Sequence, residues 1–230
     1  MNDALTYQRI GAYGGTFDPI HNGHIEVARF ISELFRLDLL LLIVAASPPH
    51  KDPGSISSAY HRFAMAALAT LDLPRVRVSL LELEQHARPY TFETVGALRR
   101  TYGDESAIFF VIGSDSFDEL HKWKEPGRIL DNSNIIVAAR PGYQIAGSEL
   151  PGQIASAQIV DLRGAAFGNW APDRRARGGI YLTDRVAVDV SSSEIRHKVA
   201  CHQSIEGLMP GAVTEYINKY GLYQDADKGK

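Results

Sequence analysis

Apolar and polar positions alternate along the first third of the chain in a way that predicts a strand, a helix and a second strand. The half-apolar run Arg9–Tyr13 predicts a strand, and apolar residues then recur three or four apart across a predicted helix, His24–Leu37. The run Leu39–Ala45 is apolar at every position, which is typical of a central parallel strand covered by helices on both faces.

The same alternation continues toward the middle of the chain. Helices are predicted at Ala59–Leu71 and Thr91–Tyr102, and strands at Val76–Leu80, Ala107–Ile112 and Ile135–Ala139. Right-handed crossovers between such strands build an α/β fold, a Rossmann-like doubly wound parallel sheet with helices on both faces. Ligands of this architecture bind beyond the carboxyl ends of the strands, so the loops there are expected to hold the chemistry.

The periodicity changes after the fifth predicted strand. The stretch Pro141–Arg177 is rich in Gly, Ala, Pro and Arg and is predicted to be irregular. Two strands, Ile180–Leu182 and Val186–Val190, and a helical C-terminal part that begins near Ser193 and Pro210 are then expected. We therefore divide the chain into an N-terminal extension (1–8), one domain (9–223) and a disordered tail (224–230).

Composition and charge narrow the class of protein. The 230 residues are 45% hydrophobic and 22% charged, values that are typical of a globular protein. The net charge of -3 argues against a nucleic-acid partner. The apolar run Leu39–Ala46 is far shorter than the roughly 20 residues that cross a bilayer, and the first ten residues lack a signal-peptide pattern. The single cysteine, Cys201, cannot form an internal disulfide, so the chain is expected to be cytoplasmic and not membrane-bound. A homo-oligomer is possible, and the sequence leaves the oligomeric state open.

The loop after the first strand carries the strongest chemical signal. It contains Gly14 and Gly15, whose backbone can approach a ligand closely, followed by Thr16 and Phe17. His21 and His24 lie three residues apart at the start of a helix and therefore project to one side. Because a helix N-terminus offers free N–H groups and a positive dipole end, this arrangement suits a phosphate group.

Simpler interpretations of the two histidines also exist. A His-x-x-His pair is often only an exposed neighbour of a helix cap, and the glycine context is what favours a ligand site here. A metal site needs further ligands, and no His, Glu or Asp set at matching spacing accompanies the pair, so we predict no metal site on the protein. The common phosphate-binding motifs GxxxxGK[ST] and GxGxxG are absent from this loop.

The segment GGTFDPIHNGH contains the HxGH motif of the nucleotidyltransferase superfamily and resembles the bacterial nicotinate-nucleotide adenylyltransferases in particular. Similar segments follow in the family's order from Arg9 to Tyr223: Pro48–Lys51, Tyr90–Thr91, Gly113–Ser116, Trp123, Arg140–Tyr143, Val190–Arg196 and Leu208–Tyr223. Two departures are visible. Val190–Arg196 keeps the hydroxyls and the arginine of the family's segment with other residues between them, and Gly164–Gly178 is longer than the family pattern.

The resemblance implies adenylyl transfer from ATP to nicotinate mononucleotide, which yields nicotinate adenine dinucleotide and pyrophosphate in NAD biosynthesis. The acceptor's own phosphate attacks the α-phosphorus, so the protein positions and neutralises anions rather than supplying a nucleophile. His21, His24 and Arg196 are the expected catalytic residues, and Mg²⁺ is expected as an ion carried by the ATP phosphates. The expected ATP-binding residues are Gly14, Gly15, Thr16, Phe17, Lys51, Ser192 and Ser193.

The expected acceptor-binding residues lie in the later loops and are Tyr90, Thr91, Asp115, Trp123 and Arg140. Tyr90 and Thr91 open a predicted helix whose free N–H groups suit the nicotinate carboxylate, and Trp123 offers a flat face to the pyridine ring. Trp123 stands in a polar stretch, which favours this interpretation over the usual core position of a tryptophan.

Two other functions remain open from the sequence. One is a sister adenylyltransferase that acts on nicotinamide mononucleotide or another phosphorylated acceptor, such as pantetheine phosphate. The other is a catalytically silent nucleotide-binding module. Tyr90, Thr91 and Trp123 argue for a pyridine acceptor, and His21, His24 and Arg196 argue for catalysis.

Overall fold

The predicted alternation of strands and helices forms a parallel sheet in the computed structural model, which describes residues 7–46, 56–84, 89–139, 159–164, 172, 177–184 and 190–224. Seven strands within these ranges pair in the order β3-β2-β1-β4-β5-β7-β6, and every pair is parallel. The strands are β1 (Arg9–Gly15), β2 (Leu39–Val44), β3 (Val76–Ser79), β4 (Ala107–Gly113), β5 (Asn134–Ala138), β6 (Ile159–Asp161) and β7 (Ile180–Thr183).

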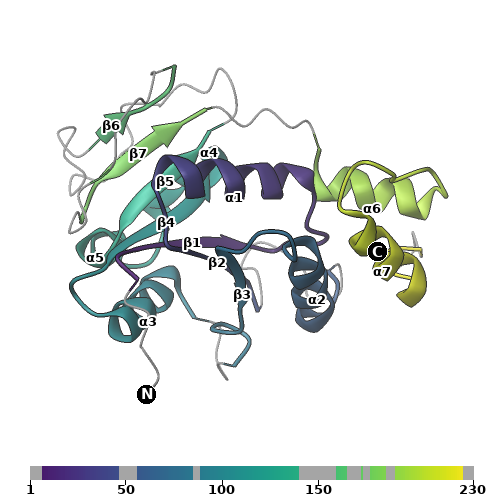
Figure 1. Cartoon of the computed structure of the whole chain (residues 1–230), viewed down its shortest axis with the longest axis horizontal. Helices are drawn as coiled ribbons and strands as arrows, with labels where there is room; N and C mark the ends of the chain where they lie inside the picture. The colour runs from purple at the N-terminus through teal and green to yellow at the C-terminus, as the bar shows by residue number, and fades with distance from the viewer. Residues whose placement is uncertain are drawn as a thin grey trace.

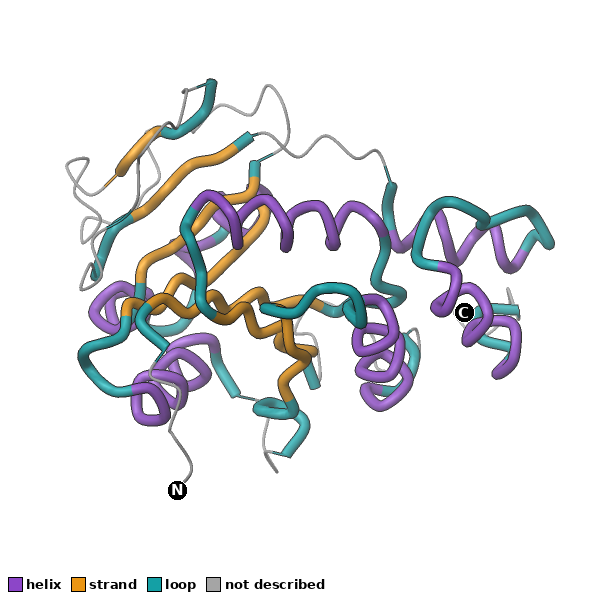
Figure 2. Tube along the Cα trace, viewed as in Figure 1, coloured by secondary structure: helices purple, strands orange, loops and turns teal. Residues whose placement is uncertain are grey.

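Helices cover both faces of this sheet, so the predicted fold class is confirmed (Figure 1). They are α1 (Asn22–Leu34), α2 (Ala59–Ala69), α3 (Thr91–Tyr102), α4 (Ser114–Asp118), the 3₁₀ turn η2 (Leu120–Lys122), α5 (Pro126–Asn132), α6 (Ser192–Ala200) and α7 (Gly211–Tyr220). The C-terminal helices α6 and α7 lie beyond the sheet, beside the start of α1 (Figure 2). A hydrogen bond joins α1 to the segment between α6 and α7: the Asn22 N–H donates to the Leu208 carbonyl at 3.0 Å.

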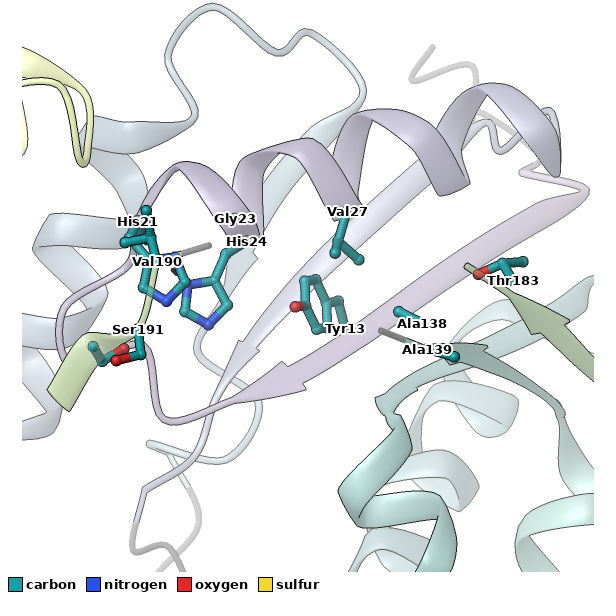
Figure 3. A pocket seen from close by; sticks show the side chains of 11 residues that line it. Tyr13, His21, Gly23, His24, Val27, Ala138, Ala139, Thr183, Val190 and Ser191 are labelled. Carbon is teal, nitrogen blue, oxygen red and sulfur yellow. Dashed lines mark hydrogen bonds between the residues drawn. The ribbon is translucent and has the colours of Figure 1, made fainter. Parts of the chain in front are cut away.

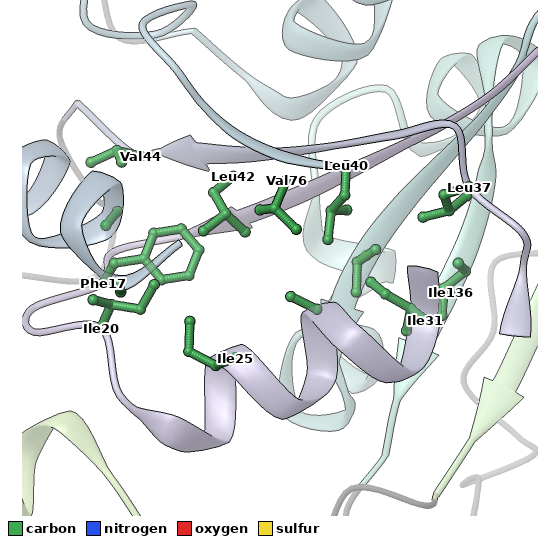
Figure 4. Close-up of a cluster of buried hydrophobic side chains, with 14 of the residues drawn as sticks. Phe17, Ile20, Ile25, Ile31, Leu37, Leu40, Leu42, Val44, Val76 and Ile136 are labelled. Atoms are coloured by element: carbon green, nitrogen blue, oxygen red, sulfur yellow. The ribbon is translucent and has the colours of Figure 1, made fainter. Parts of the chain in front are cut away.

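Alternating side chains of the strands divide the hydrophobic core in two. On β2, Leu40, Leu42 and Val44 face the core under α1 and α2, which we call the α1 core (Figure 4). The intervening residues of the same strand face the opposite core, which is completed by α3 and α5 and which we call the α3 core. All six residues of β2 are buried, which is why its sequence is apolar throughout.

The order of the strands places the ligand crevice. From β1 the chain winds first to β2 and β3 on one side, and then to β4 and the later strands on the other side. In an open parallel sheet, the crevice lies where the winding direction reverses, which here is beyond the carboxyl ends of β1 and β4. The loop after β1 therefore stands at the expected position.

Some predicted elements differ from the structure. The stretch Pro141–Arg177 contains the short strand β6, so the prediction of an irregular stretch is wrong at Ile159–Asp161. This edge strand has only three residues, too few to show a period. The short helices α4 and α5 were also not predicted, for the same reason. The first helix begins at Asn22 and ends at Leu34, ahead of the predicted His24–Leu37.

Several sequence predictions concern residues outside the described ranges. The proposed strand Val186–Val190 has only Val190 within them, and this residue is not in a strand. Most of the extra stretch Gly164–Gly178, residues 1–6 and residues 225–230 also lie outside. The division into an extension, a domain and a tail therefore stays a prediction.

Candidate active site

The loop between β1 and α1 contains the two glycines that the sequence marks. Phe17 follows them with a left-handed φ of 51°, and only 1% of its surface is exposed. A Cβ on Gly15 would lie 2.7 Å from the Phe17 ring, and one on Gly14 would lie 3.3 Å from the Phe110 ring. The glycines therefore make room for aromatic rings of the protein itself. The Phe17 side chain belongs to the α1 core, and its ring meets the His24 ring edge-on, with the centroids 5.1 Å apart.

His21 and His24 lie side by side at the start of α1, as their spacing predicts (Figure 3). Their ring centroids are 3.8 Å apart. His21 is the N-cap residue, and its backbone N–H donates to Nδ1 of His24 at 3.2 Å. Since Nδ1 of His24 accepts this hydrogen bond, the neutral ring carries its proton on Nε2. His24 is thereby oriented as a hydrogen-bond donor at the helix N-terminus.

Burial keeps the imidazole of His21 uncharged. The side chain is 7% exposed, and desolvation lowers the pKa of His21 to about 4 from its ordinary value of 6.5. Its Nδ1 is buried and has no hydrogen-bond partner among the parts of the chain that the structure describes. A buried polar atom without a partner is uncommon in proteins, and here the His21 side chain faces the backbone N–H of His24 in a capping box.

A cavity of about 260 Å³ opens next to the two histidines. Its lining comes from β1, α1, the ends of β5 and β7 and the start of α6: Tyr13, His21, Gly23, His24, Val27, Ala138, Ala139, Thr183, Val190, Ser191 and Ser192. Apolar residues form one part of this lining, and the histidines and serines form the other. Such a division suits a ligand with an aromatic base and an anionic end.

Helix α6 begins as the sequence predicts and is hydrogen-bonded to residues 16–21, which we call the histidine loop. Ser191 is its N-cap, and the Ser191 hydroxyl accepts the Glu194 N–H at 3.1 Å. The Ser192 hydroxyl donates to the Pro19 carbonyl at 2.9 Å, and Arg196 donates from Nη1 to the Asp18 carbonyl at 2.7 Å. The second Arg196 nitrogen, Nη2, lies 3.4 Å from the Ser193 hydroxyl. The structure thus brings the predicted catalytic residues of two distant segments together.

Of the predicted acceptor residues, Trp123 packs against the α3 core, and Tyr90 and Thr91 stand at the start of α3. Tyr90 is the N-cap of α3, and its N–H donates to the Glu93 carboxylate at 2.8 Å, which leaves the N–H groups of Thr91 and Phe92 without an intrahelical acceptor. The Lys124 ammonium lies 4.2 Å from the centroid of the Tyr90 ring. Trp123 is half-buried, and its ring meets the Phe110 ring edge-on at 6.5 Å.

The remaining predicted residues have different outcomes. Asp115 is exposed in the first turn of α4, directly after β4. Thr16 lies in the histidine loop, and its carbonyl accepts a hydrogen bond from Arg62. Lys51 and Arg140 lie outside the described residues. Within the described part of the chain, no three His, Cys, Asp or Glu side chains gather as metal ligands, and no helix is long and apolar enough to cross a membrane.

Comparisons with known proteins match this chain over most of its length. The model of the cytidylyltransferase-like family matches residues 12–198. A probable nicotinate-nucleotide adenylyltransferase of Citrifermentans bemidjiense is 36% identical over 95% of this chain and 99% of its own. One of Thermoanaerobacter sp. is 32% identical over 96% and 97% of the two chains. The chain belongs to the nicotinate-nucleotide adenylyltransferase family.

Solved structures show the same fold. The nicotinic acid mononucleotide adenylyltransferase of Plasmodium falciparum, in its complex with NaAD, superposes with a TM-score of 0.68 at 21% identity. The match covers 94% of this chain and 97% of that chain. The curated relatives confirm the resemblance to the nicotinate-nucleotide adenylyltransferases that the loop motifs indicate, and the solved structure shows the same fold.

Sequence reasoning missed three residues that hold the histidine loop of this family member, the buried Asp18 and Arg62 and the partly buried Tyr223. Asp18 and Arg62 are fully buried, and the Tyr223 hydroxyl donates to the Asp18 carboxylate at 2.6 Å. Arg62 donates to the carbonyls of Ser57 and Thr16 at 3.0 and 2.8 Å. One signal was available, because Arg62 lies at helical spacing from the buried Met65 and Ala66 and thus on the apolar face of its helix.

Proposed function

We propose that this protein transfers the adenylyl group of ATP to nicotinate mononucleotide and releases pyrophosphate. The observation that carries the proposal is the paired His21 and His24 at a helix N-terminus, bonded through the loop to Arg196 and open to a cavity. The curated relatives bear the name of this activity, and the similar Plasmodium falciparum enzyme was solved with NaAD.

The reaction needs positioned donors more than a protein nucleophile. A phosphate oxygen of nicotinate mononucleotide attacks the α-phosphorus of ATP, and the bond from this phosphorus to the bridging oxygen of the β-phosphate breaks. Charge grows on the leaving pyrophosphate. His24 is oriented to donate from Nε2, and Arg196, bonded to the Asp18 carbonyl three residues before His21, supplies a fixed positive charge. His21 acts as a neutral group, because burial lowers its pKa to about 4.

ATP is assigned to the cavity beside the histidines. The base and ribose would lie along Ala138, Ala139 and Val190, and the phosphates would extend to His24 and the start of α6. Mg²⁺ would enter with the ATP phosphates, since this ion often binds through few protein groups and no three protein ligands gather within the described ranges. A cytoplasmic location agrees with the single cysteine, Cys201, and with the use of ATP.

The acceptor is assigned to the region between Trp123 and α3. The N–H groups of Thr91 and Phe92 point from the positive end of α3, which favours a carboxylate over a carboxamide. The ammonium of Lys124 and the guanidinium of Arg128 lie over the rings of Tyr90 and Phe92 and add positive charge to this end of the helix. An acid form of the pyridine nucleotide therefore fits best.

The experiment is a product assay on the purified chain with MgATP and a panel of phosphorylated acceptors. Nicotinate mononucleotide should give equal amounts of nicotinate adenine dinucleotide and pyrophosphate, separated by chromatography. His24→Ala, prepared in the same way, is the negative control. The proposal fails if nicotinate mononucleotide yields no dinucleotide. This holds both when ATP stays intact with every acceptor and when ATP is consumed only with pantetheine phosphate.

A further inference from the structure

The C-terminal end of the described chain makes a direct contact with the histidine loop, residues 16–21. We propose that Tyr223 is a positioning residue, which holds this loop through Asp18 in the geometry that adenylyl transfer requires. The proposal rests on the proposed function, because it concerns how the same histidines and Arg196 are held. It assigns to the C-terminus a role that neither the loop motif nor the cavity suggests.

Asp18 is the point at which three distant segments meet. Its carboxylate accepts the Tyr223 hydroxyl at 2.6 Å through Oδ1 and the Ser57 N–H at 3.3 Å through Oδ2. Its backbone carbonyl accepts Nη1 of Arg196 at 2.7 Å. Asp18 is fully buried and lies three residues before His21. A shift of Asp18 therefore displaces Arg196 and the histidine loop together.

The charge of the Asp18 carboxylate has a buried counterpart. Attraction to the Asp18 carboxylate favours the charged form of the nearby Arg62 guanidinium. This guanidinium also donates hydrogen bonds to the carbonyls of Ser57, Thr16 and Ala46. Burial, together with the negative charge of Asp18, raises the pKa of Tyr223 far above its ordinary value. The phenol therefore stays protonated and donates to the carboxylate throughout the working pH range.

The backbone at Tyr223 also points to a specific role. Helix α7 ends at Tyr220 and is capped by Gly221 with a φ of 60°, and Tyr223 itself has a φ of 63°. Non-glycine residues rarely adopt this left-handed conformation, and such strain is retained where the surrounding structure requires it. Leu222 and Tyr223 pack against the α1 core, which directs the phenol inward to Asp18.

The two substrates should respond differently to a loss of this contact. Asp18, Arg62 and Tyr223 lie on the side of the α1 core, whereas the acceptor residues Trp123 and Phe92 pack against the α3 core on the other face of the sheet. Loosening the histidine loop should therefore lower kcat and leave the Michaelis constant for the acceptor unchanged. Because a loss of folded protein also lowers the apparent kcat without changing KM, kcat is expressed per folded protein, determined from the melting curve of each variant.

The test compares Tyr223→Phe with the matched control Tyr220→Phe, which removes a hydroxyl from an exposed tyrosine of the neighbouring helix. Misplacement by about 1 Å can cost roughly a hundredfold in rate, so we expect kcat of Tyr223→Phe to fall by at least about tenfold. The KM for nicotinate mononucleotide should match that of wild type, and Tyr220→Phe should retain wild-type kcat. Rates are measured well below the melting temperature of each protein.

A double-mutant cycle with Arg196→Lys provides a second measurement. If Tyr223 acts through the loop and Arg196, Tyr223→Phe should cost less in the Arg196→Lys background than in wild type. Asp18→Asn retains an oxygen that accepts the phenol, so its kcat should stay well above that of Tyr223→Phe. This variant also keeps the proposal testable if Tyr223→Phe fails to fold. A kcat of Asp18→Asn below a tenth of wild type would overturn the positioning role of Tyr223, because it would assign the effect to the charge of Asp18.

The outcomes separate this proposal from the proposed function. A wild-type chain that makes no dinucleotide from nicotinate mononucleotide defeats the function itself. An active wild type with Tyr223→Phe equal to Tyr220→Phe, or with additive costs in the cycle, overturns the positioning role alone. A raised acceptor KM with unchanged kcat overturns it as well.

Discussion

Replacing the buried His21 by asparagine tests the claim that this residue acts as a neutral group. Asparagine is a favourable N-cap residue, so α1 keeps its cap. Its side chain takes up no proton in acid, so the substitution removes the titration of His21. In wild type, His21 is 7% exposed, and burial lowers its pKa to about 4. The unfolded chain takes up a proton near the ordinary pKa of 6.5, whereas the folded chain resists protonation down to about 4.

The sign and size of the effect follow from this difference. Between pH 6.5 and 4, the unfolded state binds more protons than the folded state, so the free energy of unfolding falls as the pH decreases. Each unit of pKa difference corresponds to about 1.4 kcal/mol, so His21 contributes a loss of roughly 2 kcal/mol between pH 7.5 and pH 5.0. Above pH 6.5 its contribution to the pH dependence vanishes.

The assay is urea denaturation of wild type and His21→Asn at pH 7.5 and pH 5.0. Other groups titrate in both proteins, so the difference between their pH-induced losses isolates His21. We expect His21→Asn to lose about 2 kcal/mol less than wild type over this interval. The control His197→Asn removes an exposed histidine and leaves His21 in place, so it should show the wild-type loss. Equal losses in wild type and His21→Asn would refute the argument that His21 is buried and neutral.

Further substitutions test the assigned roles one by one. His24→Ala should lower kcat by about a hundredfold or more, because the donor is lost, and should destabilise the fold by about 1 kcal/mol, because the cap is lost. His24→Asn should lower kcat alone. A normal kcat in either variant contradicts the role of His24 as a hydrogen-bond donor to the phosphates. Arg196→Lys should weaken the use of ATP without changing the choice of acceptor, because charge remains and the bidentate fork is lost; steady-state kinetics with two acceptors decide this. Trp123→Ala should raise the KM of both pyridine acceptors and spare ATP binding measured by calorimetry, and an unchanged acceptor KM would exclude stacking.

The sequence predicted the sheet because its strands are continuous apolar runs of ordinary length. Leu39–Val44 is buried on both faces, and Ala107–Ile112 of β4 shows the same pattern. The histidine pair and the cap at Ser191 were also predictable, since each depends on neighbours within one helical turn.

Long-range contacts were beyond the reach of the sequence. Tyr223 and Asp18 are 205 residues apart, and nothing in a single chain indicates that they bond. The packing of Phe17 against Gly15 was also hidden, because a glycine pair suggests close approach but not what approaches. Short elements such as β6 and α4 contain too few residues to show a period.

The ratio of specificity constants for nicotinate and nicotinamide mononucleotide tests the central claim most directly. The positive end of α3 favours the carboxylate of nicotinate, because it presents the N–H groups of Thr91 and Phe92 and the nearby Lys124 ammonium. The Tyr90 N–H does not contribute, because it already donates to the Glu93 carboxylate. A dipole contribution of about 0.3–2 kcal/mol corresponds to a preference of at most about thirtyfold, and a carboxamide that leaves hydrogen bonds unpaired adds to it. We predict a kcat/KM for nicotinate mononucleotide at least about tenfold above that for nicotinamide mononucleotide. Equal values, or a higher value for the amide, would contradict the account.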